Sequence, residues 1–188
     1  MSHSIRNPNT VQILHLSMHG SKEDVLLGGS HPVPWTTLAG FVGLVKVATG
    51  DRLLLSMSSC EGYYGIQMAT LLDEPPFFGL VGPTDTVAWE DSWMAFAAYY
   101  EEITKDSATF NSAVDKMNSV GIEKLTFKYK LGADAFSDHL VSMKSAPVDQ
   151  TRWLAQLKKA QNTRDAALRA FVDELQKLTP SSPPPAQG

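Results

Sequence analysis

Two short hydrophobic runs dominate the first third of the chain, and both end in small or polar residues. The first covers 11–19 (VQILHLSMH) and stops at Gly20, and the second, over 53–55, is followed by serines and then by Cys60. Runs this short, bounded by turn residues, are typical of strands buried on both faces. Because parallel strands end at the same edge of a sheet, we expect His19 and Cys60 to lie close together there.

The residues between and after these runs show helical spacing. Hydrophobic residues recur at helical intervals over 35–50 and again over 89–103, where aromatic residues form one helix face that we interpret as core packing. The pattern also predicts a hairpin over 24–33, a helix over 66–72 and a third strand over 77–81. This alternation of strands and helices is typical of parallel strands joined by right-handed crossovers.

After residue 103 the pattern becomes that of a sheet edge. A helix capped by Asp106 or Ser107 is predicted to end at Gly121, and 122–131 alternates apolar residues with lysines. Lysines on an exposed strand discourage pairing with other sheets. We therefore expect an α/β three-layer sandwich with a mostly parallel sheet and an edge strand near its end.

The chain divides into four parts by composition. A polar segment covers 1–10, the α/β domain covers 11–148, a helical segment covers 149–178, and a tail rich in proline and serine covers 179–188. The apolar stripe of the 149–178 segment is typical of a helix packed on the domain, and the alternative is self-association or docking to a partner protein. The tail has too few apolar residues to form a core, so we expect it to be disordered.

Overall composition narrows the class of protein. The chain has 188 residues, 43% of them hydrophobic, which suits one core, and its net charge of −4 without a basic cluster does not suggest a nucleic-acid partner. A single cysteine excludes an internal disulfide and is typical of a reducing compartment. The start of the chain is polar, and no apolar run approaches the ~20 residues that span a bilayer. We expect a cytoplasmic protein without membrane contact.

The single cysteine is the centre of the candidate chemistry. Cys60 follows a predicted strand and precedes a predicted helix, a position that stabilises a thiolate, and His19 is the candidate base. The residues required for other kinds of site are missing from the sequence. For a zinc site the remaining histidines are too scattered, for a cysteine phosphatase no arginine follows Cys60 to hold the phosphate, and for a nucleotide enzyme no glycine-rich loop is present. We expect neither a metal nor a cofactor.

The order and spacing of these motifs resemble the caspase-like cysteine peptidases and, within them, the CHAT domains. The similarity covers about residues 11–130 and rests on LHLSMHG and LLLSMSSCEG, with the cysteine 41 residues after the histidine. It implies a doubly wound sandwich and a dyad of His19 and Cys60 that hydrolyses protein or peptide substrates through a thioester. It also implies an oxyanion hole made by the backbone N–H groups of Gly20 and Cys60.

Two features depart from that family pattern. An upstream strand and helix of larger members has no counterpart before residue 11, so we expect the sheet to be short there or completed by a partner. Relatives that cleave after basic residues tend to carry an acid two positions before the cysteine, where this chain has Ser58. Glu61 and Asp85 are further candidate substrate-binding residues. The alternative function is a catalytically silent module that binds a protein partner.

Overall fold

The central element is a four-stranded sheet. The computed structural model describes residues 10–28, 30–50, 52–71, 74–120 and 126–145. Within them the sheet has the order β1-β5-β6-β7, built from β1 (Gln12–Leu16), β5 (Leu53–Met57), β6 (Gly79–Pro83) and β7 (Phe127–Leu131). β1, β5 and β6 pair in parallel, whereas β7 pairs with β6 in the antiparallel sense. The prediction of a mostly parallel sheet with an edge strand near its end is confirmed.

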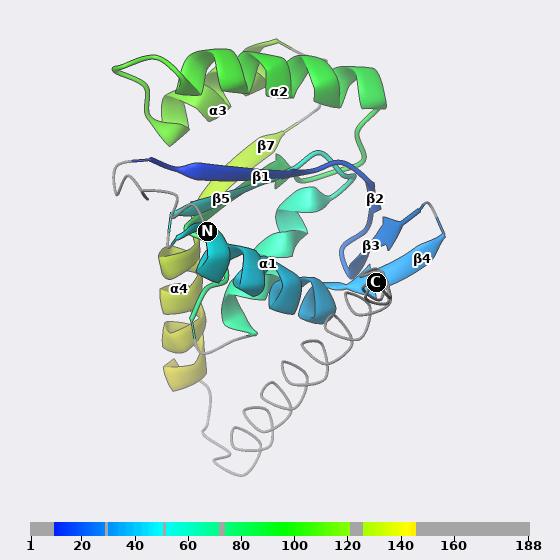
Figure 1. Cartoon of the computed structure of the whole chain (residues 1–188), viewed down its shortest axis with the longest axis vertical. Coiled ribbons are helices and arrows are strands. Elements are labelled where there is room, and N and C mark those ends of the chain that lie inside the picture. Colours follow the sequence, from blue (N-terminus) through cyan, green and yellow to red (C-terminus); the bar gives the residue numbers. More distant parts are fainter. Residues whose placement is uncertain (1–9, 29, 51, 72–73, 121–125, 146–188) are drawn as a thin grey trace, which may run out of the picture.

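Helices cover both faces of this sheet (Figure 1). One face carries α1 (Trp35–Thr49), the 3-10 helix η1 (Gly62–Thr70) and α4 (Gly132–Ser145). The other face carries α2 (Trp89–Ile103) and α3 (Phe110–Ser119). The sheet therefore lies between two helical layers.

Strand β5 connects the two halves of the core. All five of its residues are buried. Leu53, Leu55 and Met57 pack towards α1 and η1, whereas Leu54 packs towards α2 and α3, as the alternation of a strand requires. Complete burial of one such leucine contributes about 1.5–3 kcal/mol to folding. β5 and the residues that follow it are thus held firmly in place.

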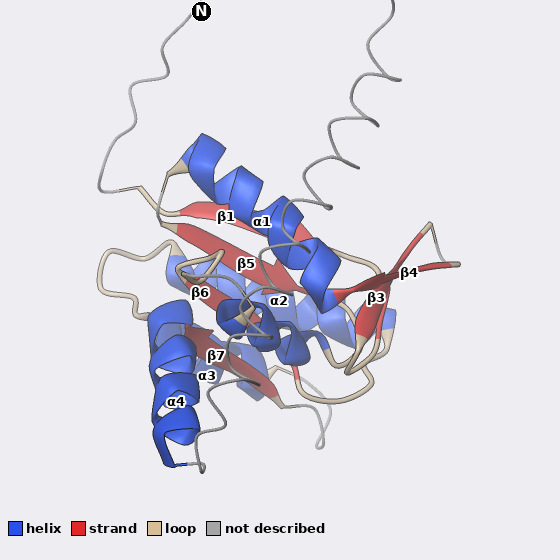
Figure 2. Ribbon diagram, turned by 90° about the horizontal axis from the view of Figure 1, so that it is seen from below, coloured by secondary structure: helices blue, strands red, loops and turns tan. Residues whose placement is uncertain are grey.

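A second, smaller sheet follows β1 directly. It has the order β2-β3-β4, from β2 (His19–Gly20), β3 (Asp24–Leu27) and β4 (His31–Pro34), and all its pairings are antiparallel. The predicted hairpin over 24–33 is confirmed. Figure 2 shows this sheet to one side of the central sheet.

The prediction of one strand over 11–19 is wrong, because β1 ends at Leu16 and His19 belongs to the small sheet. The carbonyl oxygen of Leu16 accepts a hydrogen bond from Ser58 N–H at 3.0 Å, just where the partner strand β5 also ends. Beyond this point the chain leaves the central sheet, and Gly20 pairs with Val25 instead.

Other predicted boundaries need correction. The helix predicted over 66–72 is a 3-10 helix that already begins at Gly62, and the third strand begins at Gly79 rather than at residue 77. Helix α3 is capped by Thr109, not by Asp106 or Ser107, because Thr109 and Ser112 form a reciprocal capping box.

Helix α4 is not predicted by the hydrophobic pattern of the chain. Its apolar residues Leu140 and Val141 are 40% and 63% exposed, so they do not form the buried stripe by which a helix is recognised. The 1–10 segment, apart from residue 10, and the 149–178 and 179–188 segments lie outside the described residues. Among the helices that the structure describes, none is long and apolar enough to cross a membrane.

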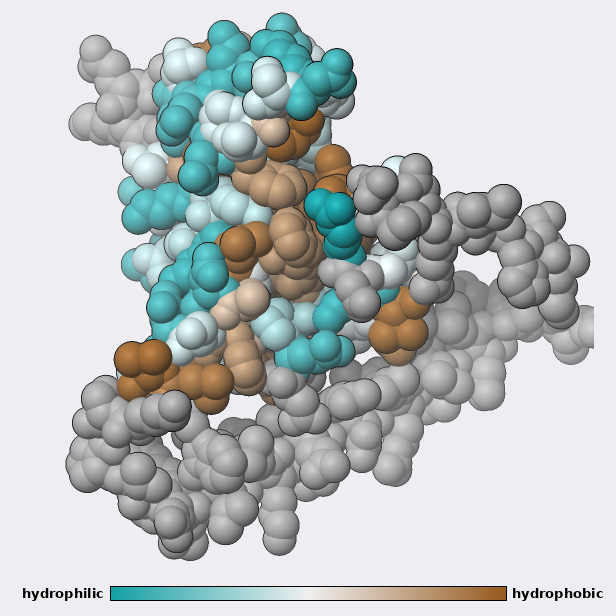
Figure 3. All heavy atoms as spheres, turned by 90° about the vertical axis from the view of Figure 1, so that its left-hand side faces the viewer, coloured by the Kyte–Doolittle hydropathy of each residue, from teal (hydrophilic) through white to brown (hydrophobic). Residues whose placement is uncertain are grey.

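The two ends of the parallel strands face opposite sides of the molecule. β1 runs from left to right in Figure 1, so its amino end lies on the side that Figure 3 presents. On that side hydrophobic residues form a band that runs from top to bottom near the middle, with hydrophilic residues at the top and on the left. β2 and the small sheet lie at the other end, where the candidate chemical groups are.

Candidate functional site

The pairing of β1 with β5 brings the two candidate residues to one edge. The last pair in register is Leu16 with Met57, and His19 and Cys60 each follow three residues later. Contact between the two segments is direct: a Cβ atom added to Gly20 would lie 2.8 Å from the carbonyl oxygen of Cys60. Only glycine fits at position 20 without a shift of the backbone.

The turn that carries Cys60 is held by backbone hydrogen bonds. Gly62 N–H donates to the carbonyl oxygen of Ser59 at 3.0 Å, and Glu61 N–H donates to that of Asp85 at 3.0 Å. Glu61 adopts the left-handed conformation with φ 54°, which is sparsely populated by residues other than glycine and typical of functional turns. The bond from Glu61 therefore fixes this turn to the loop between β6 and α2.

The Cys60 thiol is half-buried and points towards the α2 side of the sheet. Its sulfur donates to the carbonyl oxygen of Val87 at 3.6 Å and packs against the core between the sheet and α2. His19 is exposed on the small sheet. Among the described residues no hydrogen bond joins the Cys60 thiol to His19. The structure thus brings the two residues to the same edge but does not connect them by a bond.

The three predicted substrate-binding residues have different surroundings. The Glu61 carboxylate forms an ion pair with Lys22 at 3.6 Å. Asp85 is exposed, and its carboxylate accepts a hydrogen bond from Thr86 N–H at 2.7 Å. Ser58 lies below α2 and contributes to a pocket that the sequence analysis did not predict.

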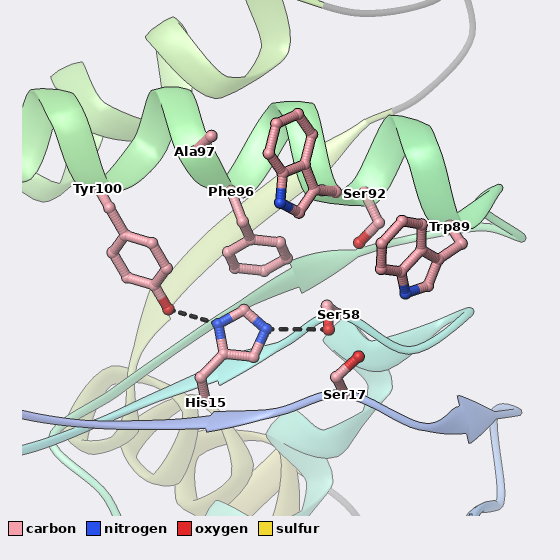
Figure 4. Close-up of a pocket in the computed structure, with 9 residues that line it drawn as sticks. His15, Ser17, Ser58, Trp89, Ser92, Phe96, Ala97 and Tyr100 are labelled. Atoms are coloured by element: carbon pink, nitrogen blue, oxygen red, sulfur yellow. Dashed lines mark hydrogen bonds between the residues drawn. The ribbon is translucent and has the colours of Figure 1, made fainter.

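This pocket, called the aromatic pocket below, has a volume of about 230 Å³ and lies between the sheet and α2 (Figure 4). Its lower wall consists of His15 on β1, Ser17 just after β1 and Ser58 just after β5. Its upper wall comes from α2 and consists of Trp89, Ser92, Trp93, Phe96, Ala97 and Tyr100.

His15 is held at the base of the aromatic pocket by hydrogen bonds to both ring nitrogens. Nδ1 lies 2.6 Å from the Tyr100 hydroxyl and Nε2 lies 2.9 Å from Ser58 Oγ. Ser58 Oγ donates to the Leu16 carbonyl oxygen at 3.4 Å and so accepts from Nε2–H, which leaves Nδ1 to accept from Tyr100. Burial lowers the pKa of His15 and raises that of Tyr100. Both groups are therefore held in their neutral forms.

The upper wall contains a buried hydroxyl without a partner. Ser92 is 3% exposed, and its Oγ has no hydrogen-bond partner among the described residues. Figure 4 shows that the hydroxyls of Ser92 and Ser17 point towards one another from opposite walls. Leaving a buried hydroxyl unsatisfied costs about 1–3 kcal/mol, so this group is available for a ligand.

Two aromatic residues of α2 contradict the prediction that its aromatic face packs in the core. Trp89 is 70% exposed and Trp93 is 62% exposed. Phe96 of the predicted face is buried, as expected, but the other buried residues of α2 lie on the neighbouring face and are Ser92, Ala95, Ala98 and Tyr99. The prediction is wrong for the tryptophans because the helical spacing does not say which side of the helix meets the sheet.

One sequence signal could have revealed the lower wall. In β1 and the residues after it, Leu14, Leu16 and Met18 pack on the α1 side, whereas the alternate positions His15 and Ser17 line the aromatic pocket. The same alternation of apolar and polar residues occurs at the end of β5. Polar residues on one face of two adjacent buried strands indicate a cavity or a site on that face.

The edge thus combines a thiol, an exposed imidazole, a tightly packed glycine and an uncharged pocket. In the part of the chain that the structure describes, no group of three or more histidine, cysteine, aspartate or glutamate side chains could hold a metal ion. A scan of the chain against protein-family models finds no match, and a search of curated proteins finds none either.

Proposed function

We propose that this protein is a cysteine peptidase with a caspase-like, doubly wound fold of the CHAT type, in which Cys60 is the nucleophile and His19 is the general base. The observation that carries the proposal is that His19 and Cys60 lie at the same edge of the central sheet. His19 and Cys60 follow adjacent parallel strands at the same distance from the last paired residues, and Gly20 contacts the backbone of Cys60. Active sites of α/β proteins occur at this edge of the sheet.

In the proposed reaction His19 takes the proton of the Cys60 thiol, and the resulting thiolate attacks the carbonyl carbon of a peptide bond, whose oxygen becomes an oxyanion. When the tetrahedral intermediate collapses, the C–N bond breaks and the departing amine takes a proton from His19, which leaves a thioester on Cys60. A water molecule then gives a proton to His19 and attacks the thioester carbon. The C–S bond breaks and His19 returns the proton to the sulfur, which releases the acid and the free thiol. Every proton taken up by His19 is returned within the cycle.

The oxyanion would be bound by the backbone N–H groups of Gly20 and Cys60. Two observations support this assignment. No described residue accepts a hydrogen bond from the Cys60 N–H, and the backbone of Gly20 lies against the Cys60 turn with no room for a side chain. Close approach of two backbone segments is what a pair of converging N–H donors requires.

The second candidate function is a catalytically silent module that binds a protein partner. It is favoured by the position of the thiol, which donates to the Val87 carbonyl oxygen instead of bonding to His19. Catalytic hydrogen bonds are often long in the absence of substrate, so this geometry is compatible with both functions.

Labelling of the only cysteine separates the two functions. We expect a fluorescent iodoacetamide to modify Cys60 of the folded protein at pH 6.5, and to do so at least tenfold more slowly in His19→Ala, because the imidazole supports the thiolate. His31→Ala is the matched control, since His31 is another exposed histidine of the small sheet. A thiol that reacts only after unfolding supports the silent module.

The same proteins are then incubated with a mixture of peptides, and new termini are identified by mass spectrometry. We expect wild type and His31→Ala to generate them and Cys60→Ala and His19→Ala to generate none. The free energy of unfolding of these variants should stay within about 1–2 kcal/mol of wild type, because His19 is exposed, Cys60 is only half-buried, and neither belongs to the central sheet. New termini produced by Cys60→Ala would reject the mechanism.

A further inference from the structure

We propose that the aromatic pocket binds an uncharged aromatic side chain of the substrate, next to the bond that is cleaved, and that it prefers tyrosine. The role in cleavage rests on the proposed peptidase function, whereas binding of the side chain does not.

Three chain segments connect the aromatic pocket to the candidate dyad. Ser17 lies two residues before His19, and Ser58 lies two residues before Cys60. Trp89 lies two residues after Val87, whose carbonyl oxygen accepts from the Cys60 thiol. A spacing of two residues in an extended chain corresponds to about 7 Å. Residues 58–60 form a turn, so about 7 Å is an upper limit for that segment, and the aromatic pocket lies within reach of a side chain beside the scissile bond.

The size of the aromatic pocket suits one side chain. Its volume of about 230 Å³ is smaller than the roughly 300–1,000 Å³ of sites for drug-sized ligands and cofactors. Trp89 and Trp93, with 70% and 62% of their surface exposed, are covered when a ring enters between them and the lower wall. Exposed indoles of this kind are typical binding residues.

The chemistry of the walls excludes charged side chains. No aspartate, glutamate, lysine or arginine is among the described residues that line the aromatic pocket. Both ring nitrogens of His15 at its base are already hydrogen-bonded, one to Tyr100 of the upper wall and the other to Ser58. A charged side chain would lose its water here without gaining a partner, whereas an aromatic ring gains edge and face contacts with the indoles and Phe96.

The preference for tyrosine follows from Ser92. Its buried hydroxyl has no hydrogen-bond partner among the described residues, and it points into the space that a bound ring would occupy (Figure 4). A phenol hydroxyl can both donate to and accept from serine, so it satisfies this group, whereas phenylalanine leaves it unsatisfied. Ser17 faces the same space from the opposite wall and offers a second hydroxyl.

Binding is tested on the full-length Cys60→Ala protein, which cannot cleave. The indole N–H resonances are assigned by single Trp→Phe substitutions, and N-acetyltyrosinamide, N-acetylphenylalaninamide, N-acetylargininamide and N-acetylaspartic acid amide are titrated in. We expect the Trp89 and Trp93 resonances to shift with saturation for the two aromatic ligands. The tyrosine ligand should bind about fivefold more tightly than the phenylalanine ligand because of one added hydrogen bond. Trp35 is the internal control, since it is buried on the other face of the sheet with its indole N–H bonded to Lys22.

Two substitutions sharpen this binding test. Ser92→Ala should reduce the affinity for the tyrosine ligand to that for phenylalanine, and Trp93→Ala should weaken both by at least tenfold. Met94→Ala is the matched control, because Met94 is exposed on the same helix but does not line the aromatic pocket. Equal shifts with the arginine or aspartate ligand, or no saturable shift with either aromatic ligand, would overturn the proposal.

Cleavage by wild type separates this proposal from the peptidase function. We expect new termini to cluster next to tyrosine and phenylalanine and kcat/KM at these sites to fall at least tenfold in Trp93→Ala but not in Met94→Ala. Saturable aromatic binding without any cleavage supports the pocket and rejects the peptidase. Cleavage next to charged residues, with no selection of aromatic ones, supports the peptidase and overturns the pocket.

Discussion

The two faces of the central sheet differ in what their cores contain. The face under α1, η1 and α4 is filled mainly by leucine, valine, methionine and alanine side chains, with two buried aromatic residues and one partly buried. The face under α2 and α3 has three buried aromatic residues and three partly buried ones. It also includes the buried hydroxyls of Ser92 and Tyr99, which have no hydrogen-bond partner among the described residues. The same strands build both faces, because alternate residues point in opposite directions. One face is therefore suited to stability, while the other leaves polar groups and a pocket available for binding.

The aromatic pocket lies where the second face is incompletely filled. α2 packs against the sheet through Phe96 and Tyr99, but its first turns extend over the end of β1 with Trp89 and Trp93 exposed. In a close-packed interior such a gap would cost stability. Its position next to the segments that lead to His19 and Cys60 fits the binding role proposed above.

The largest effect is expected on the stable face. Leu55 is completely buried, and Leu55→Ala should lower the free energy of unfolding by about 2–5 kcal/mol, since the cavity it leaves is surrounded by packed side chains. Urea denaturation followed by circular dichroism measures this loss. Val141→Ala, at an exposed position of α4, should change stability by less than about 0.5 kcal/mol. A loss below about 1 kcal/mol for Leu55→Ala would show that this core is loosely packed.

On the other face, removal of the hydroxyl group should change the stability of the protein in opposite directions at two adjacent tyrosines. Burial raises the pKa of Tyr99, and its hydroxyl has no hydrogen-bond partner in the described part of the chain, so Tyr99→Phe should stabilise the protein by about 1 kcal/mol. The Tyr100 hydroxyl bonds to His15, so Tyr100→Phe should destabilise it by about 0.5–1.5 kcal/mol. Thermal and urea denaturation of both variants measures the difference. Loss of stability in Tyr99→Phe would mean that its hydroxyl is satisfied after all.

The smallest effect concerns the pH dependence of stability. Burial lowers the pKa of His15 in the folded protein, so the unfolded chain takes up this proton first as the pH falls. The contribution of neutral His15 is complete above its unfolded pKa of about 6.5 and is lost as the pH falls towards the lower folded pKa. His15→Gln should therefore have a shallower loss of melting temperature than wild type below pH 6.5. For one proton the slope cannot exceed about 1.4 kcal/mol per pH unit. Parallel curves for the two proteins would exclude His15 as the titrating group.

The local pattern of the sequence was sufficient to predict most helices and strands and the sheet edge at which the candidate site lies. The spacing over 35–50 and 89–103 predicts α1 and α2, and the short runs ending near His19 and Cys60 predict two neighbouring strands. These predictions succeed because helix and strand periods, and the stop signals at their ends, depend on residues close together in the chain. The rule that parallel strands end at one edge then brings His19 and Cys60 together.

Only the tertiary structure decided which groups surround that edge. The pairing of β1 with β5 ends at Leu16, so His19 lies outside the central sheet. The way in which α2 packs on the strands leaves Trp93 exposed and directs Ser92 inwards. The aromatic pocket joins residues from β1, the end of β5 and α2, which are far apart in the sequence. Such contacts depend on how the elements pack against one another. The periodicity of a helix or strand shows which of its faces is apolar, but it does not show which other element covers that face.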